Sequence, residues 1–69
     1  MVTKSPIEPD EQAIMALQQL STGADVHETN GFIYTYRLHC AIGNIGDAGE
    51  AKRTMYRRAR ELMRRHERS

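Results

Sequence analysis

The sequence predicts an all-α fold of three helices, in a single small helical domain over residues 1–69. Apolar residues recur at three- and four-residue intervals, and glycines stand where such segments end. A chain this short hides only about 60% of the surface that its unfolded form exposes, so one core is marginal. Its single cysteine excludes an internal disulfide. We therefore expect a homodimer, in which each copy carries a C-terminal helical hairpin.

The first helix is predicted over residues 6–21. Ser5-Pro6-Ile7-Glu8 has the form of a capping box with proline at the first helical position. Pro9 removes a backbone donor from the first turn, so the regular helix can begin as late as Asp10. Gly23 is placed to close the helix in a left-handed conformation. The apolar stripe consists of Ala13, Ile14, Leu17 and Leu20.

The middle segment has two interpretations. Asn30-Gly31 is a strong hairpin signal, and alternating apolar residues follow it, which favours an α+β fold with a short hairpin at 24–40. The same segment also has helical spacing from Tyr34 to Ile45, with Asn30 placed as a cap. The strand before the turn would be short and polar, and an isolated hairpin is marginal. We favour a helix over residues 30–44.

The last helix is predicted over residues 48–66, where the pattern is clearest. Gly46 is placed to end the preceding helix, and Asp47-Ala48-Gly49-Glu50 has the form of a capping box. Basic residues fill the later turns, where the helix dipole favours positive charge. The apolar stripe consists of Ala48, Ala51, Met55, Ala59 and Leu62. We expect the dimer interface to use this stripe, namely Ala51, Met55, Ala59 and Leu62, together with Leu17 and Tyr34.

Charge is distributed unevenly along the chain. Residues 1–46 contain two basic and five acidic residues, whereas residues 47–69 contain eight basic and four acidic ones. The basic residues of the second part are seven arginines and one lysine, and the arginine fork binds carboxylates and phosphates with two hydrogen bonds. Four of them fall on one flank of the predicted helix: Arg53, Arg57, Arg60 and Arg64. This flank is either a contact surface or a solvated basic face.

A protein partner fits this composition better than a nucleic acid does. Interfaces are enriched in tyrosine, arginine and methionine, and the chain supplies Tyr34 and Tyr36 in addition to the arginine flank. DNA is the second, less favoured target, because the pI of about 8.0 is below the range of nucleic-acid modules. The basic helix also offers few side chains that read bases. The sequence leaves open which face the partner contacts.

Catalytic, metal and membrane functions find little support in the residues. His39 and Cys40 are adjacent, and neighbours on a helix do not face each other, so we expect no catalytic dyad. The three histidines are scattered and there is no phosphate-binding loop, so we expect no metal, no cofactor and no enzyme activity. No apolar run approaches the roughly 20 residues of a membrane helix. We expect a cytoplasmic protein.

By its length, and by the stretches "GFIYTYRLHC" and "AKRTMYRRARELMRRHE", the chain resembles a family of small early bacteriophage proteins that block quorum sensing. The resemblance implies a helical dimer that binds the DNA-binding domain of a LuxR-type activator and keeps it off DNA. It also implies a second target, the motor ATPase of type IV pili. The DNA-reading surface of such a regulator is basic, so the acidic N-terminal side of this chain is the expected docking face. That side consists of Glu8, Asp10 and Glu11.

Overall fold

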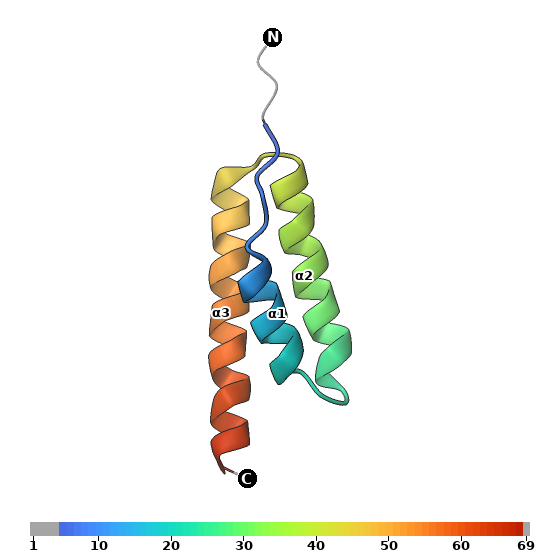
Figure 1. Ribbon diagram of the computed structural model, residues 1–69, viewed down its shortest axis with the longest axis vertical. Helices are drawn as coiled ribbons and strands as arrows, with labels where there is room; N and C mark the ends of the chain where they lie inside the picture. Colours follow the sequence, from blue (N-terminus) through green and yellow to red (C-terminus); the bar gives the residue numbers. More distant parts are fainter. Residues whose placement is uncertain (1–4, 69) are drawn as a thin grey trace.

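The computed structural model describes residues 5–68, which form three helices and no strand. The helices are α1 (Glu11–Leu20), α2 (Asp25–Ala41) and α3 (Ile45–Arg68). Helices α2 and α3 form an antiparallel hairpin, and α1 packs against both of them, running in the same direction as α3 (Figure 1). The predicted all-α class is confirmed. The alternative of a β-hairpin at 24–40 is wrong.

Helix α1 begins five residues later than predicted. Asp10 is the N-cap, and its Oδ1 accepts a hydrogen bond of 3.2 Å from the Ala13 amide. Residues 5–10 are not helical and instead run lengthwise between α2 and α3 (Figure 1). There the Ile7 amide donates to the Cys40 carbonyl over 2.8 Å. The predicted cap at Ser5 is therefore wrong, because Pro9 cannot supply a helical donor and Asp10 can accept one.

Helix α2 begins earlier and ends earlier than predicted, and Asn30-Gly31 lies in its interior. The inward residues follow a helical period: Thr29, Ile33, Tyr36 and Cys40 are all buried. Burial of this stripe explains why the strong local hairpin signal does not decide the structure. The helix ends before Gly43, whose φ of 72° lies in the left-handed region, and not at Gly46. Gly23 has the predicted left-handed conformation, with a φ of 57°, but it lies in the turn before α2 and does not close α1, which ends at Leu20 with Ser21 as its C-cap.

Helix α3 begins three residues before the predicted start, because Asn44 caps it. The Asn44 Oδ1 accepts from the Asp47 amide over 3.1 Å, and its Nδ2 donates to the Asp47 carboxylate over 2.7 Å. This reciprocal pair replaces the predicted box of Asp47 and Glu50, and it places Gly46 inside the first turn. None of the helices in residues 5–68 is long and apolar enough to cross a membrane.

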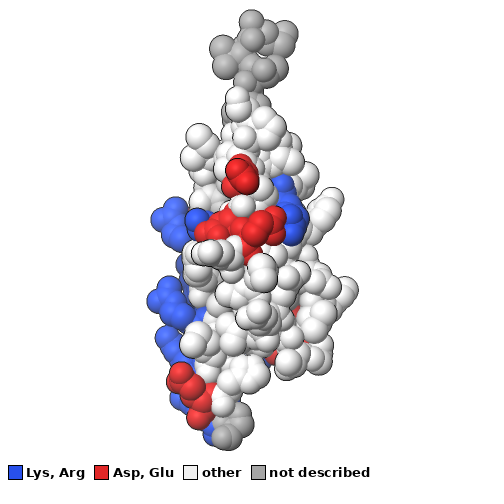
Figure 2. Space-filling view, in the orientation of Figure 1, with Lys and Arg blue, Asp and Glu red and all other residues white. Residues whose placement is uncertain are grey.

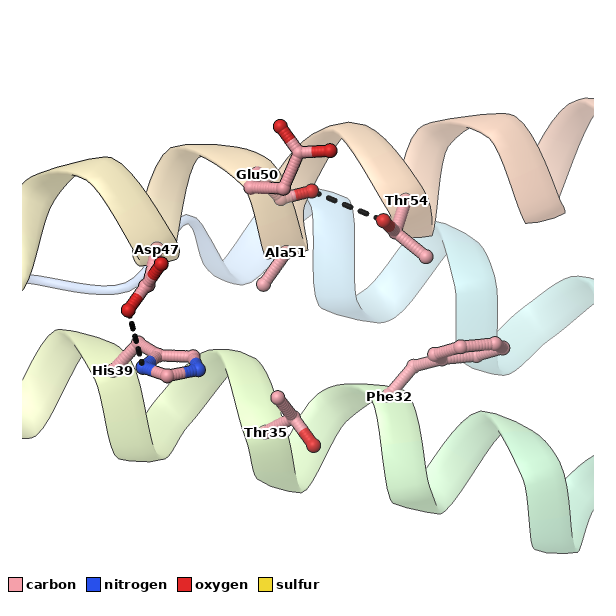
Figure 3. A pocket seen from close by; sticks show the side chains of 7 residues that line it. All are labelled: Phe32, Thr35, His39, Asp47, Glu50, Ala51 and Thr54. Atoms are coloured by element: carbon pink, nitrogen blue, oxygen red, sulfur yellow. Dashed lines mark hydrogen bonds and ion pairs between the residues drawn. The ribbon is translucent and has the colours of Figure 1, made fainter.

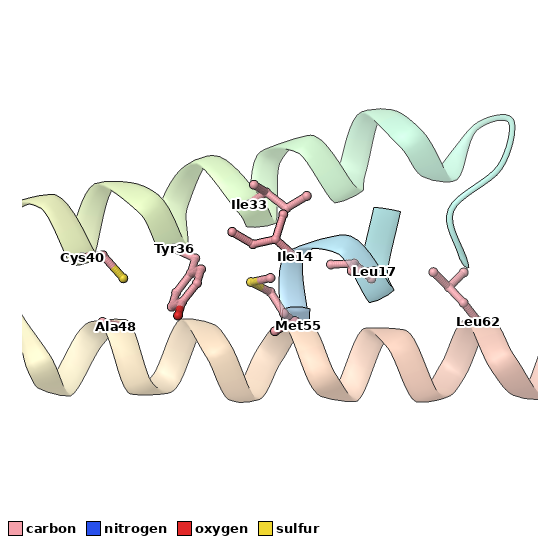
Figure 4. Packing of buried hydrophobic residues seen from close by; sticks show 9 residues of the cluster. Ile14, Leu17, Ile33, Tyr36, Cys40, Ala48, Met55 and Leu62 are labelled. Carbon is pink, nitrogen blue, oxygen red and sulfur yellow. The ribbon is translucent and has the colours of Figure 1, made fainter. Parts of the chain in front are cut away.

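The core lies along the line where α1 meets α2 and α3. Figure 4 shows side chains of all three helices pointing toward one another there. Leu17 is 0% exposed, and Met55 and Leu62 are each 1% exposed. The predicted dimer interface is therefore wrong for these three residues, because α1 covers the stripe of α3 within one chain. Ala59 packs against the same core and is only partly buried.

Tyr36 was expected at a partner-binding surface, but it is a core residue with 3% exposure. Its hydroxyl accepts a hydrogen bond of 2.7 Å from the Asp10 amide, which joins α2 to the start of α1. Burial raises the pKa of this phenol. The other end of α1 is joined to α2 by a hydrogen bond between the buried hydroxyls of Ser21 and Thr29.

Candidate protein-binding surfaces

The arginines of α3 fall into two groups that differ in their counterions. Arg58 is only 13% exposed, and it forms ion pairs with Asp25 (3.2 Å), Glu28 (3.4 Å) and Glu61 (3.1 Å). Arg65 also contacts Asp25, over 3.3 Å. Two carboxylates at the start of α2 thus attract this side of α3. These contacts stabilise the hairpin and leave Arg58 little freedom to meet another molecule.

The second group is the predicted flank of Arg53, Arg57, Arg60 and Arg64, which we call the arginine stripe. All four residues are exposed. Within residues 5–68 only Arg53 has a counterion, Glu50 at 3.6 Å, and both side chains of this pair are exposed. Figure 2 shows basic side chains along the edge of the molecule that α3 forms. The structure therefore brings the predicted residues together and leaves three of them without an acidic partner in the described chain.

An apolar groove of about 500 Å³ adjoins the arginine stripe, between α1 and α3. We call it the arginine groove, and its apolar lining is Ala16, Leu20, Tyr56, Ala59 and Met63. Arg53, Arg57 and Arg60 form the rim on the α3 side. Tyr56 and Met63 are each nearly half exposed, so water covers them in the single chain. A surface that offers apolar contact beside exposed arginines has the composition of a protein interface.

The predicted acidic docking face is largely neutralised. Figure 2 shows acidic side chains gathered where α1 begins, with basic side chains on both sides. Asp10 pairs with Lys52 at 3.0 Å, and Glu11 pairs with Arg37 at 3.1 Å. Of the three predicted residues, only Glu8 has no ion pair with a described residue. The attraction of this face for a basic regulator surface is correspondingly weak.

The pKa values of the Asp10–Lys52 pair reflect this pairing. The hydrogen bond from Lys52, and then the one from the Ala13 amide, lower the pKa of the Asp10 carboxyl. The same hydrogen bond raises the pKa of the Lys52 ammonium. Asp10 also accepts a hydrogen bond of 3.3 Å from the Tyr56 hydroxyl, so this carboxylate positions a wall of the arginine groove. The Asp10 carboxylate therefore stabilises the fold of the chain itself.

A second exposed apolar surface lies on α2. Tyr34 is 68% exposed, and Leu38 and Ile42 lie one and two turns further along the same stripe. Ile45, at the start of α3, is 78% exposed but lines a different groove, together with Ile7 and Glu8. We call the exposed, uncharged stripe the α2 outer face: His27, Asn30, Gly31, Tyr34, Thr35, Leu38, Ala41 and Ile42. Sequence reasoning named Tyr34 but missed the other large apolar members, since their spacing equally suits a core.

The groove between α2 and α3 contains His39, the residue that invites a catalytic interpretation (Figure 3). His39 Nδ1 lies 3.9 Å from the Asp47 carboxylate. The hydroxyls of Thr35 and Thr54 donate to carbonyls of their own helices, at 3.0 and 3.1 Å. Cys40 points into the core and is buried. Among the residues that line this groove, no nucleophile is hydrogen-bonded to a base, which is the geometry that nucleophilic catalysis requires.

Comparisons with protein-family models, with curated proteins and with solved structures find no match for this chain. Within residues 5–68, no group of histidine, cysteine and carboxylate side chains is placed to hold a metal ion. The two exposed apolar surfaces and the arginines are therefore the features of the molecule that indicate a function.

Proposed function

We propose that this chain is a non-enzymatic protein-binding inhibitor, encoded by a bacteriophage, that acts as a homodimer in the host cytoplasm. Its partner is a LuxR-type transcriptional activator whose DNA binding it blocks, and the motor ATPase of type IV pili is a second target. The resemblance supplies these partner classes. One observation supports the protein-binding role: an apolar groove whose rim includes Arg57 and Arg60, two arginines with no acidic partner within residues 5–68.

The arginine groove is the surface that we assign to the partner. Its arginines are the residues most enriched at interface hot spots, together with the tyrosine that forms part of its lining. The acidic side of the molecule is a weaker choice, because Lys52 and Arg37 already neutralise two of its carboxylates. If the activator is the partner, it therefore contacts this chain through a surface other than its basic DNA-reading face.

Inhibition can be measured directly. A LuxR-type activator is bound to its operator in a gel-shift assay, and increasing amounts of the chain are added. We expect the shifted band to disappear, and we expect Arg57→Gln/Arg60→Gln to require at least about tenfold more protein, since two interface arginines are lost. Arg37→Gln/Arg65→Gln removes the same charge outside the arginine stripe and should inhibit like the wild type. An activator that stays on DNA at every concentration of the chain contradicts the proposal.

DNA binding is the second candidate function, and the arginine stripe favours it. Phosphates would be natural counterions for Arg57, Arg60 and Arg64, and such binding weakens steeply as salt rises. The same gel shift without the activator tests this candidate at two salt concentrations. A salt-sensitive shift of duplex DNA by the chain alone would support DNA binding. No shift at low salt removes it.

The α2 outer face is the surface that we assign to the second copy of the chain. Tyr34, Leu38 and Ile42 are exposed on it, and the face contains no Asp, Glu, Lys or Arg. Because two copies of one face meet in a symmetric dimer, a face without such charges brings no like charges together. Gly31 lies in the middle of this helix, at a cost of about 1 kcal/mol relative to alanine.

The single chain offers no packing reason for this glycine, since an added Cβ would meet nothing within 4 Å. Close approach of a second helix would provide one. We therefore place the dimer interface on α2, in place of the buried stripe of α3. This interface leaves the arginine groove accessible in both copies, because the groove lies between the other two helices.

Leu38→Glu is expected to dissociate the dimer, because the new carboxylates of the two copies meet across the interface. Val26→Glu is the matched control, since Val26 is an exposed apolar residue of α2 outside the outer face. Sedimentation equilibrium should show at least about a tenfold weaker association for Leu38→Glu and no change for Val26→Glu. A wild-type chain that sediments as a monomer at micromolar concentration contradicts the dimer.

A further inference from the structure

We propose that the arginine groove binds an amphipathic helix of the partner, with an apolar face toward the groove and acidic residues along one flank. This inference rests on the proposed protein-binding function and specifies the chemistry of the partner segment. The observation that carries it is the juxtaposition of an apolar groove with a one-sided row of arginines.

The length of the groove suits about three turns of a docked helix. Arg53 and Met63, the first and last α3 residues of its lining, are ten residues apart, which corresponds to about 15 Å along the helix axis. Apolar residues at positions i, i+3 or i+4 and i+7 of a docked helix span about 10 Å, so they fit within this length. They would contact Leu20 from α1 and Tyr56 and Met63 from α3. The groove is therefore long enough to bury one apolar helix face.

The acidic character of the partner follows from the charges within the chain. Asp25, Glu28 and Glu61 are engaged by Arg58, on another side of α3. Asp10 and Glu11 are engaged by Lys52 and Arg37. These carboxylates do not reach the arginine stripe, so an acidic flank on the partner would supply counterions to Arg57 and Arg60. Such arginine–carboxylate contacts are charge-assisted and can be bidentate.

A bound nucleic acid would explain the arginines of this surface but not its apolar groove. Phosphates would neutralise the arginines, but a duplex backbone would leave the apolar lining of the groove without a contact. A docked helix would also bury the exposed apolar lining, which contributes about 25 cal/mol to the binding free energy for each Å² removed from water. Met63 is the residue that separates the two cases, because it is exposed, uncharged and part of the groove lining.

The test uses a fluorescent synthetic helix of about 16 residues, with leucines on one face and glutamates along one flank. A second peptide has lysine in place of each glutamate. Anisotropy titrations with the full chain should show at least about tenfold tighter binding of the acidic peptide. Met63→Gln and Arg57→Gln/Arg60→Gln should each weaken it at least about fivefold, whereas Arg37→Gln/Arg65→Gln, outside the arginine stripe, should not.

Three results overturn the inference: equal binding of both peptides, no effect of Met63→Gln, or a short DNA duplex that competes for Arg57 and Arg60 while remaining insensitive to Met63→Gln. The peptide assay and the activator assay test the helix-binding groove and the inhibitor role independently of each other. Loss of peptide binding with intact inhibition of the activator refutes the helix-binding groove and leaves the inhibitor role standing. Tight peptide binding with no effect on the activator supports the groove and refutes that role.

Discussion

Leu17→Ala is expected to lower the free energy of unfolding by about 3 kcal/mol, as for other fully buried leucines. Leu17 is completely buried where α1 meets the α2–α3 hairpin, and its removal leaves a cavity that a short helix cannot fill. A domain of this size has a total stability on the order of 3–10 kcal/mol, so the change removes a large share of it. Urea denaturation followed by circular dichroism measures the difference.

Met15→Ala is the matched control for this prediction, since Met15 lies on the same helix and is exposed. Alanine is at least as good a helix former as methionine, so the stability should change by no more than about 0.5 kcal/mol. Equal losses for the two variants would contradict the packing of α1 described above. So would a loss below about 1 kcal/mol for Leu17→Ala, because a leucine in a surface interface would be tolerated in the single chain.

Arg58→Ala is expected to lower the free energy of unfolding by about 2 kcal/mol, less than for a fully buried ion pair. The variant leaves Asp25 and Glu61 without their nearest cation, and it also removes packing by the side-chain stem. Glu28 is half exposed, so water solvates its carboxylate once the guanidinium is gone. The loss of stability is therefore smaller than for the removal of one partner of a fully buried ion pair. Thermal and urea denaturation measure the loss.

Arg57→Ala, one residue away, is the control and should change stability by no more than about 0.5 kcal/mol. Arg57 is exposed and has no ion pair with any residue in the range 5–68. The two variants would thus show that the arginines have different roles: Arg58 stabilises the fold, and Arg57 affects partner binding alone. A destabilised Arg57→Ala, or a fully stable Arg58→Ala, would show that the two groups are assigned wrongly.

Much of the fold follows from periodicity along the chain. The stripe from Ala48 to Leu62 predicts α3, since its three- and four-residue spacing has no β interpretation. The middle segment is harder, because its alternating apolar residues from Phe32 to Ile42 satisfy both periods. Ile33 breaks the strand alternation, and it joins Thr29, Tyr36 and Cys40 on the buried side of α2. This residue is the signal that favours the helix.

The candidate surfaces were less predictable than the helices. An apolar stripe shows that something covers it, but the stripe does not say whether α1 or a second copy does so. Met55 and Leu62 therefore read equally well as core and as dimer interface. Tyr34 and Tyr36 point about 200° apart on a helix, so one is exposed and the other buried, and only the packing of α1 decides which.

The division of the arginines depends on contacts that local sequence does not contain. Asp25 precedes Arg58 by 33 residues, and only the hairpin brings them together. Neutralisation of the acidic N-terminal side has the same origin, because Lys52 and Arg37 come from two other helices. Charge counts along the chain describe which groups are present, and the fold decides which of them are already satisfied.

The segment of residues 5–10 has a consequence for the chemistry of the single thiol. Ile7 packs on the core and its amide is bonded to the Cys40 carbonyl, so this segment closes the end of the molecule over the buried sulfur. An alkylating reagent can reach Cys40 only when that end opens. The rate at which Cys40 is alkylated in the native protein therefore measures how often that end of the molecule opens. This measurement needs no introduced label.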